Sequence, residues 1–367
     1  MKVLIAGGGT AGHVFPALAL ARRLDPIEHE VRFAGIASGQ EARLVAEAGF
    51  AFDAVQATPL ERRASLKALR APLTAIRSVG ACRPLTDWAD VVVGMGGYVS
   101  VPVSLAALRG RRPLVLHEQN AVPGLANRTL ARPARAVALA FADARRAFPR
   151  RTRTVVTGNP VREQIVAVSN ERDRLRKEAA SELDLEEGRR TLVVFGGSQG
   201  ALRVNRSVVD AIPRLGLSDL QVLLLTGPAH EASVRASLPP ESSVVVRLRG
   251  FLERMELAYA IADVVVARAG ATTVAEIAVC GIPSLLIPYP YATGRHQEAN
   301  ARVLQRAGAA SMLLDDELDG SVVAERIRWL IDDGERLREM GERARAWASP
   351  DAAGKLADVV LEAAGRA

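Results

Sequence analysis

The chain of 367 residues is long enough for about two domains, because a domain usually spans roughly 100–200 residues. Hydrophobic residues make up 49% of it and aromatic residues only 4%, which is typical of parallel sheets covered by alanine-rich helices. Residues 1–153 carry 22 Lys and Arg against 11 Asp and Glu, whereas residues 154–367 carry 26 against 30. This asymmetry predicts an anionic partner for the first half, such as a membrane surface, a phosphorylated substrate or nucleic acid.

Several protein classes are excluded by what the sequence lacks. Cys82 and Cys280 lie far apart and show no metal-ligand spacing, so we expect reduced thiols in a cytosolic protein. The apolar stretch after Lys2 is short and runs into glycines, so no signal peptide is expected, and no apolar run is long enough to span a bilayer. Nucleic acid is the weaker choice of partner and is not expected, because no recognition motif is visible and aromatic residues for base stacking are few.

Short apolar runs that are typical of buried parallel strands alternate with helical patterns along the chain. In the first half the strands are expected at 3–6, 31–34, 91–93, 114–116 and 155–156, with helical patterns such as 16–24 and 40–48 between them. In the second half they are expected at 191–195, 222–226, 244–248, 264–267 and 284–287. The alternation predicts an α/β fold whose parallel sheets have right-handed crossovers.

The chain also contains an internal repeat. Ala-Asp-Val-Val-Val occurs at 89–93 and again at 262–266, and a strand followed by glycines occurs both at 2–12 and at 191–200. Two similar halves predict two Rossmann-like, doubly wound domains with a ligand-binding cleft between them. We place the first domain at 1–160 and the second at 161–367, and we leave open whether the last helix, about 345–367, packs back on the first domain.

The first glycine-rich turn, at 7–12, fits the pattern G-x-G-x-x-G between a strand and a helix. Backbone N–H groups and the helix dipole can meet phosphate oxygens at such a turn, although a tight turn without a ligand is the alternative. A dinucleotide site would require an acidic residue at the end of the second strand. Residues 35–39 contain none, which counts against NAD.

His13 lies in the first turn of the helix that follows this loop. A helix N-terminus disfavours the charged imidazolium, so a neutral imidazole is expected there. A neutral imidazole beside a reacting hydroxyl is suited to act as a general base. The alternative is a histidine that only forms a hydrogen bond to the backbone or to a phosphate.

The second half has a matching glycine-rich turn at 196–200, in which Ser198 is either a phosphate ligand or an ordinary N-cap. Further along, Thr272 and Thr273 open a helix, and Glu276 is placed either to bind ribose hydroxyls or to complete a capping box with Thr273. The clusters at 117–120 and 296–300 are candidates for the lining of the cleft. Neither has the spacing of a metal site, so no metal is expected.

The segment 60–83 combines basic and apolar residues at helical spacing and contains one acidic residue. Such a surface suits anionic lipid headgroups, and the alternative is a core-facing helix with a basic outer face. The candidate membrane or acceptor residues in this segment are Arg62, Arg63, Leu66, Lys67, Leu69, Arg70, Leu73 and Ile76.

Taken together, the motifs resemble the MurG family, the bacterial UDP-N-acetylglucosamine–N-acetylmuramyl-(pentapeptide) pyrophosphoryl-undecaprenol N-acetylglucosamine transferases, over essentially the whole chain. The motifs are Gly-Thr-Ala-Gly-His-Val-Phe-Pro at 9–16, Met-Gly-Gly-Tyr-Val-Ser at 95–100, His-Glu-Gln-Asn at 117–120, Gly-Asn-Pro-Val-Arg at 158–162, Gly-Gly-Ser-Gln-Gly-Ala at 196–201 and Arg-Ala-Gly-Ala-Thr-Thr-Val-Ala-Glu at 268–276.

The resemblance implies a GT-B fold and inverting transfer of GlcNAc from UDP-GlcNAc to the MurNAc 4-hydroxyl of lipid I. The product would be lipid II of peptidoglycan biosynthesis, made without metal or cofactor. The enzyme would be peripheral, on the cytoplasmic face of the cell membrane, with an anionic membrane surface and other cell-wall synthesis proteins as partners.

The resemblance also implies roles for single residues. His13 would be the catalytic base, and Tyr98 would belong to the acceptor side. The donor would contact Thr10, Ala11, Gly12, Asn120, Arg162, Ser198, Leu252, Ala271, Thr272, Thr273, Val274, Ala275, Glu276 and Gln297. Two positions depart from the family: Ala11 stands where glycine is usual, and His296 where some members have glutamine.

Three rival functions fit parts of the same sequence. A UDP-sugar epimerase shares the two-domain plan but would need acid and base carboxylates in the cleft and no lipid acceptor. An NAD-dependent oxidoreductase would bind NADH and not UDP, and a nucleotide-sensing module would be non-catalytic. The basic amphipathic segment favours the transferase over the epimerase.

Overall fold

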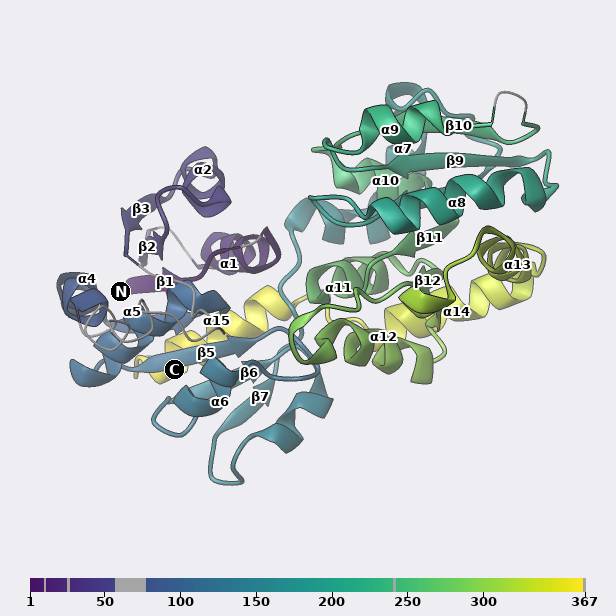
Figure 1. The fold of residues 1–367 in the computed structure, drawn as a ribbon. Helices are drawn as coiled ribbons and strands as arrows, with labels where there is room; N and C mark the ends of the chain where they lie inside the picture. The colour runs from purple at the N-terminus through teal and green to yellow at the C-terminus, as the bar shows by residue number, and fades with distance from the viewer. Residues whose placement is uncertain (10, 25–26, 57–76, 240–241, 366–367) are drawn as a thin grey trace, which may run out of the picture. The chain divides into compact units, whose positions relative to one another are not determined.

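The computed structural model describes residues 1–9, 11–24, 27–56, 77–239 and 242–365. It divides the chain into two compact units, which we call unit 1 (Met1–Arg162 with Ser349–Ala367) and unit 2 (Glu163–Ala348). Each unit is built on one parallel sheet with helices between successive strands (Figure 1). Within the described residues, no helix is long and apolar enough to cross a membrane.

Unit 1 has a sheet of seven strands in the order β3-β2-β1-β4-β5-β6-β7. The strands are β1 (Lys2–Ala6), β2 (Glu30–Gly35), β3 (Ala51–Ala54), β4 (Val91–Gly94), β5 (Leu114–Glu118), β6 (Ala136–Leu139) and β7 (Thr154–Val156). The helices are α1 (Ala11–Arg23), α2 (Gln40–Glu47), α4 (Arg83–Trp88), α5 (Gly97–Arg109), α6 (Leu125–Leu130), the 3₁₀ helix η1 (Ala142–Ala147) and α15 (Ala352–Ala363).

Unit 2 has six strands in the order β10-β9-β8-β11-β12-β13. They are β8 (Arg190–Phe195), β9 (Leu220–Leu225), β10 (Val245–Arg249), β11 (Val264–Ala267), β12 (Ser284–Leu286) and β13 (Ala310–Met312). The helices are α7 (Glu163–Glu182), α8 (Leu202–Leu215), α9 (Glu231–Ala236), α10 (Met255–Ile261), α11 (Ala271–Cys280), α12 (His296–Arg306), α13 (Gly320–Ile331) and α14 (Gly334–Trp347), with the 3₁₀ helices η2 (Thr293–Arg295) and η3 (Asp315–Glu317).

Both strand orders are those of a doubly wound sheet. In each unit the order reverses beside the first strand, between β1 and β4 or between β8 and β11. The predicted α/β class with two Rossmann-like sheets is therefore confirmed. The strands β3, β6 and β13 were not among the predicted strands, and each spans only three or four residues, a length at which an apolar run is a weak signal.

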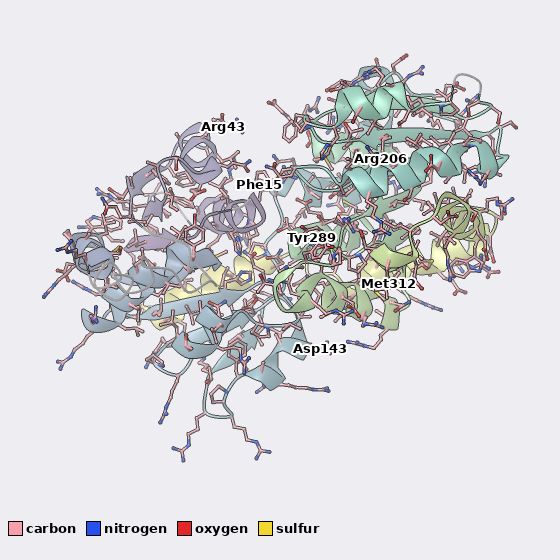
Figure 2. All side chains as sticks on the ribbon, in the orientation of Figure 1. Phe15, Arg43, Asp143, Arg206, Tyr289 and Met312 are labelled. Carbon is pink, nitrogen blue, oxygen red and sulfur yellow. The ribbon has the colours of Figure 1, made fainter. Side chains whose placement is uncertain are left out.

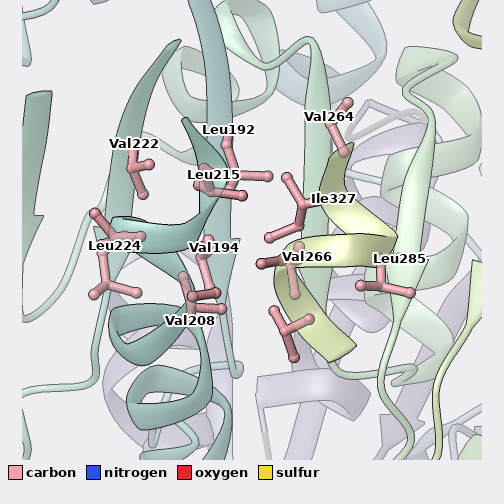
Figure 3. Packing of buried hydrophobic residues seen from close by; sticks show 14 of the residues in the cluster. Leu192, Val194, Val208, Leu215, Val222, Leu224, Val264, Val266, Leu285 and Ile327 are labelled. Carbon is pink, nitrogen blue, oxygen red and sulfur yellow. The ribbon is translucent and has the colours of Figure 1, made fainter. Parts of the chain in front are cut away.

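The sheets are buried on both faces, which explains the continuous apolar runs. In β1, Val3 and Ile5 belong to a core with α1 and α15, whereas Leu4 and Ala6 belong to a core with α5. Alternate residues of a strand point to opposite faces, so both sets must be apolar. Unit 2 repeats this pattern, and Figure 3 shows Leu192 and Val194 of β8 packed with Val208 of α8 and Ile327 of α13.

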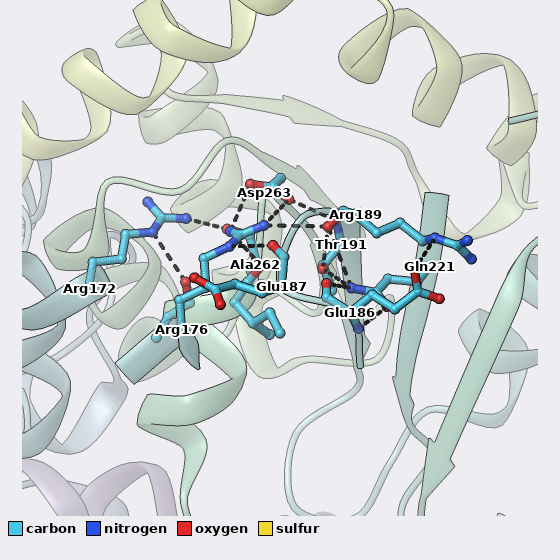
Figure 4. A network of polar contacts seen from close by, with 11 residues as sticks. Arg172, Arg176, Glu186, Glu187, Arg189, Thr191, Gln221, Ala262 and Asp263 are labelled. Atoms are coloured by element: carbon cyan, nitrogen blue, oxygen red, sulfur yellow. Dashed lines mark hydrogen bonds and ion pairs between the residues drawn. The ribbon is translucent and has the colours of Figure 1, made fainter. Parts of the chain in front are cut away.

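The repeated Ala-Asp-Val-Val-Val motif has the same structural role in both units. Asp90 precedes β4 and accepts a hydrogen bond from the backbone N–H of Lys2 at 2.8 Å. Asp263 precedes β11 and accepts from the backbone N–H of Thr191 at 2.7 Å. In unit 2 the aspartate also pairs with Arg176 of α7, with a distance of 3.1 Å between nitrogen and oxygen (Figure 4). Each aspartate therefore ties the start of the central strand to its neighbour.

The sequence left open where the last helix packs, and the structure places α15 in unit 1. Its residues Leu356 and Val360 share a core with Val3 and Ile5 of β1. The chain enters this helix where the Ser349 hydroxyl donates to the carbonyl of Thr157 at 2.9 Å. A side chain at Gly158 would lie 2.5 Å from the Ser349 Cβ, so the close approach requires glycine.

Candidate functional site

The carboxyl ends of the central strands carry the glycine-rich loops in both units. This is where ligands bind in open parallel sheets, because the strand order reverses there and the loops diverge. In unit 1 the loops follow β1 and β4, and in unit 2 they follow β8 and β11.

In unit 1 the loop after β1 packs directly on the loop after β4. A Cβ at Gly97, whose φ is +74°, would lie 2.6 Å from the carbonyl oxygen of Gly8. A Cβ at Gly7 would lie 2.9 Å from the Cβ of Met95. The two loops can therefore approach one another only because both are made of glycine.

His13 and Tyr98 lie against these loops. The imidazole of His13, in the first turn of α1, packs on Gly96, where an added Cβ would come within 3.3 Å of Nε2. Tyr98 of α5 lies beside Gly9, where an added Cβ would be 3.3 Å from Cε1. His13 thus lies against the loop after β4, Tyr98 lies against the loop after β1, and these two loops pack on each other. Ala11 begins α1, and a right-handed helix has a negative φ that any residue adopts.

The motif at 117–120 ends β5 and holds Asn120 in place. Buried Glu118 accepts from the backbone N–H of Asn120 at 3.0 Å, from that of Gly124 at 3.1 Å and from the side-chain amide of Asn127 at 2.8 Å. Burial raises the pKa of Glu118, and these donors oppose the rise. Asn127 was not predicted as a site residue, because nothing in the sequence shows that α6 turns its amide back to β5.

His117 is fully buried, and its Nε2 lies 3.3 Å from the carbonyl oxygen of Gly158. Burial lowers the pKa of this imidazole from 6.5 to about 4. Between these values the unfolded chain binds a proton that the native chain does not, so acid favours unfolding. The free energy of unfolding should therefore fall by about 3 kcal/mol as the pH falls from about 6.5 to about 4.

Urea unfolding of the wild type and of His117→Gln, near neutrality and at about pH 5, measures this contribution. The variant is neutral throughout this range, so its unfolding free energy should depend less steeply on pH. An equally steep dependence in both proteins would contradict the assignment.

Arg162 is the last residue of the main segment of unit 1. Its guanidinium lies 4.3 Å from the ring centroid of Phe15 on α1, which Figure 2 labels. This cation–π contact places Arg162 against the first turns of α1, the helix that also carries Gly12 and His13. Arg162 therefore belongs with the loop residues of unit 1, as does Asn120.

In unit 2, Ser198 lies exposed in the loop between β8 and α8. The N-cap residue of α8 is Ala201, without a side-chain cap, so the interpretation of Ser198 as an ordinary N-cap is wrong. The loop packs on the end of β9, where a Cβ at Gly200 would lie 2.0 Å from the carbonyl oxygen of Thr226. Asn205 donates to that same oxygen at 2.8 Å and so anchors the loop to the sheet.

Helix α11 begins at Ala271 after the N-cap Gly270, which makes no side-chain cap. Thr273 is therefore inside the helix, and the capping-box alternative for Thr273 and Glu276 is wrong, since that motif needs Thr273 at the N-cap. Glu276 lies one turn on, is 5% exposed and accepts a hydrogen bond from the Tyr259 hydroxyl at 2.8 Å. Tyr259 of α10 is fully buried and was missed, because a tyrosine in an apolar helix resembles any core residue.

A buried ion pair supports the loop that follows β12. Arg268 and Asp315 are both less than 9% exposed, and their charged atoms are 2.5 Å apart. Arg268 also donates to the carbonyl oxygens of Ile287 at 3.2 Å and Pro288 at 3.0 Å. The next residue, Tyr289, donates its N–H to Oε1 of Gln297 at 2.9 Å, which holds the Gln297 amide at this loop.

The remaining predicted residues fall in two groups. Leu252 is half-buried just beyond the carboxyl end of β10, and Val274 and Ala275 are buried on α11. Thr10 and the membrane candidates Arg62, Arg63, Leu66, Lys67, Leu69, Arg70, Leu73 and Ile76 lie outside the described residues. Within the described ranges, no group of three or more His, Cys, Asp or Glu side chains is placed to hold a metal ion.

Comparison with known families matches both halves of the chain. Residues 3–139 match the glycosyltransferase family 28 N-terminal domain, and residues 191–356 match the glycosyltransferase family 28 C-terminal domain. Together with the two doubly wound sheets, these matches define the class as two-domain glycosyltransferases of the GT-B type.

Relatives of known name narrow the class. A protein of Halothermothrix orenii named UDP-N-acetylglucosamine–N-acetylmuramyl-(pentapeptide) pyrophosphoryl-undecaprenol N-acetylglucosamine transferase is 41% identical, and the similarity covers 99% of both chains. A Bacillus subtilis protein of the same name is 36% identical over 99% of both chains. The crystal structure of Acinetobacter baumannii MurG is 28% identical with a TM-score of 0.80, covering 98% of this chain and 99% of that one. The chain belongs to the MurG family of glycosyltransferases.

The epimerase considered above is similar in fold alone. A UDP-GlcNAc 2-epimerase from Neisseria meningitidis, solved with UDP-GlcNAc bound, has a TM-score of 0.69 over 99% of this chain at 14% identity.

Proposed function

We propose that the protein transfers GlcNAc from UDP-GlcNAc to the MurNAc 4-hydroxyl of lipid I and so forms lipid II. The observation that carries the proposal lies at the carboxyl ends of β8 and β11 in unit 2. There α8 and α11 both begin without a side-chain cap, and Glu276 is buried one turn into α11. Uncapped helix N-termini attract a diphosphate, and a buried carboxylate is suited to ribose hydroxyls. Membership of the MurG family supports the same donor and acceptor.

In this proposal the donor binds mainly to unit 2. The diphosphate is held by the amides of the loop at 196–200, by the Ser198 hydroxyl and by the start of α11 at Ala271, Thr272 and Thr273. Glu276 binds the ribose, Leu252 lies beside the uracil and the amide NH₂ of Gln297 donates to the sugar. From unit 1, we propose that Thr10, Ala11, Gly12, Asn120 and Arg162 also contact the donor.

The chemistry we propose is a single displacement with inversion. The 4-hydroxyl oxygen bonds to the anomeric carbon while the bond from that carbon to the UDP oxygen breaks. His13 accepts the hydroxyl proton, and the leaving diphosphate takes the electron pair of the broken bond. Main-chain amides stabilise the developing negative charge, which is the task a metal ion performs elsewhere.

We further propose that unit 1 faces the membrane as a peripheral domain. Its described surface around α6 and η1 supports this, because Leu125 is 73% exposed and Val122 is 41% exposed. Exposed arginines follow them in the sequence at positions 128, 132, 145, 146, 150 and 151, and Asp143, labelled in Figure 2, is the one acidic residue between 121 and 153. Exposed apolar side chains can enter the bilayer, and arginines near them can bind anionic lipid headgroups.

Tyr259→Phe tests the ribose contact. The change removes a hydrogen bond to a carboxylate, so the KM for UDP-GlcNAc should rise by about tenfold at unchanged kcat. The wild type should prefer UDP-GlcNAc over its 2′- or 3′-deoxyribose analogue, and the variant should prefer it less. Steady-state kinetics with the three donors measure this. Equal discrimination by both proteins would place Glu276 away from the ribose.

The function itself is tested by incubating the purified protein with radiolabelled UDP-GlcNAc and a short-chain lipid I analogue, with and without a chelator. Label should pass to the lipid at the same rate under both conditions. Release of label as free sugar, or formation of a 2-epimer, would favour an epimerase. Transfer abolished by the chelator would overturn metal independence, and the absence of any transfer would overturn the proposed function.

A further inference from the structure

Glu41 is a buried carboxylate whose position the site described above does not explain. It lies in the first turn of α2, just beyond the end of β2, and is 1% exposed. Its two oxygens each lie 3.3 Å from the backbone nitrogen of Gly9, and Oε1 also accepts from the N–H of Ile36 at 3.1 Å. The carboxylate therefore reaches back from the second strand to the glycine-rich loop of the first.

Three glycines make the room for this side chain. A Cβ at Gly8 would lie 2.2 Å from Oε1 of Glu41, and one at Gly39 would lie 2.2 Å from Oε2. A Cβ at Gly35 would lie 2.7 Å from Cγ. Any other residue at these positions would displace the carboxylate, so the loop is shaped around it.

Backbone N–H groups that converge beyond the end of a central strand usually bind a phosphate of the ligand, and we call such a place an anion seat. In unit 1 the N–H of Gly9 is instead directed at a carboxylate of the protein. One amide of this loop is therefore paired with an anion of the protein before any substrate arrives.

The corresponding elements of unit 2 differ at this point. Glu231 opens α9, which follows β9 as α2 follows β2, but it pairs with Arg235 at 2.9 Å. Its Oε2 approaches Gly250, where an added Cβ would lie 2.4 Å away. Among the hydrogen bonds of the described residues, no carboxylate accepts from the amides of the loop at 196–200, and Ser198 there is exposed.

We infer that Glu41 decides which glycine-rich loop receives a diphosphate. Its carboxylate fills the anion seat of unit 1, which leaves the loop of unit 2 as the one open to the sugar nucleotide. It also fixes the loop that leads into α1, so it positions the imidazole of His13 against Gly96. This inference rests on the proposed function for the identity of the nucleotide. The contact between the Glu41 carboxylate and the glycine-rich loop of unit 1 does not depend on it.

Chemical rescue of Glu41→Ala tests the seat without any enzyme assay. The variant should lose about 4–8 °C of Tm, because two N–H groups lose a charged partner. Formate should restore at least half of this loss, whereas formamide at equal concentration should not, since the amides need an anion. Glu231→Ala is the matched control, and neither it nor the wild type should respond to formate. Equal rescue by formate and formamide would overturn the inference, because volume alone would then explain it.

Inorganic pyrophosphate tests the choice between the loops. Calorimetry should find one site on the wild type and a second on Glu41→Ala, and an unchanged stoichiometry would overturn the specificity role. Glu41→Gln, which keeps the shape of the side chain, replaces the alanine variant in these tests if that variant does not fold. Its Tm should rise with formate no more than the Tm of the wild type.

Activity provides a separate readout that depends on the proposed function. Turnover of Glu41→Ala should fall by about tenfold to a hundredfold and should recover in formate. If the wild type shows no transfer, the proposed function fails, while the rescue of Tm and the pyrophosphate stoichiometry still decide the role of Glu41.

Discussion

Replacement of His13 by alanine is expected to lower the turnover number by about a hundredfold to ten-thousandfold, with the affinity for UDP unchanged. The imidazole lies in the first turn of α1 against Gly96, and Tyr98 lies against Gly9 of the loop that leads into α1. In the proposed reaction it takes a proton from the acceptor hydroxyl, while the donor diphosphate is bound by loops of the other unit. Single-turnover transfer, together with calorimetric titration of UDP, separates the two effects.

His29→Ala is the matched control, because His29 precedes β2 at the amino end of the same sheet, opposite the glycine-rich loops. Its turnover should equal that of the wild type. Unchanged turnover in His13→Ala would remove His13 from the chemistry, and a parallel loss of UDP affinity would instead make it a donor ligand.

Arg268→Met is expected to lower the free energy of unfolding of unit 2 by about 3–5 kcal/mol. The substitution removes the buried partner of Asp315, a carboxylate that is 7% exposed, and leaves it only Arg203, which lies 3.4 Å away and is 55% exposed. It also removes the donors to Ile287 and Pro288, so the loop that orients Gln297 loosens. Denaturant unfolding measures the loss, and the KM for UDP-GlcNAc should rise in parallel.

The double variant Arg268→Met with Asp315→Leu separates charge from packing. Replacing both partners by apolar residues removes the buried charge, so most of the stability should return. The KM for the donor should stay raised, because neither new side chain can hold the two carbonyl oxygens. A double variant as unstable as Arg268→Met alone would show that the loop contacts, and not the stranded charge of Asp315, dominate.

Much of the fold could be predicted because parallel strands are buried on both faces and therefore read as apolar runs. The strand predicted at 264–267 has the same bounds as β11. The repeat at 89–93 and 262–266 correctly identifies β4 and β11 as corresponding strands of the two units. The site was harder. Ser198 and Thr273 each fitted a cap pattern, and only the observed starts of α8 and α11 excluded it.

The sequence alone determined the two doubly wound sheets, the positions of the glycine-rich loops and the family, since all of these depend on local composition and spacing. The tertiary structure decided which carboxylate meets which loop. Glu41 and Glu231 lie in the first turns of corresponding helices, yet Glu41 accepts from Gly9 of the glycine-rich loop of its unit and Glu231 pairs with Arg235. The same holds for Tyr259 and Glu276, 17 residues apart. A hydrogen bond needs its two atoms within about 3 Å along a suitable direction, and only the packed backbone sets that geometry.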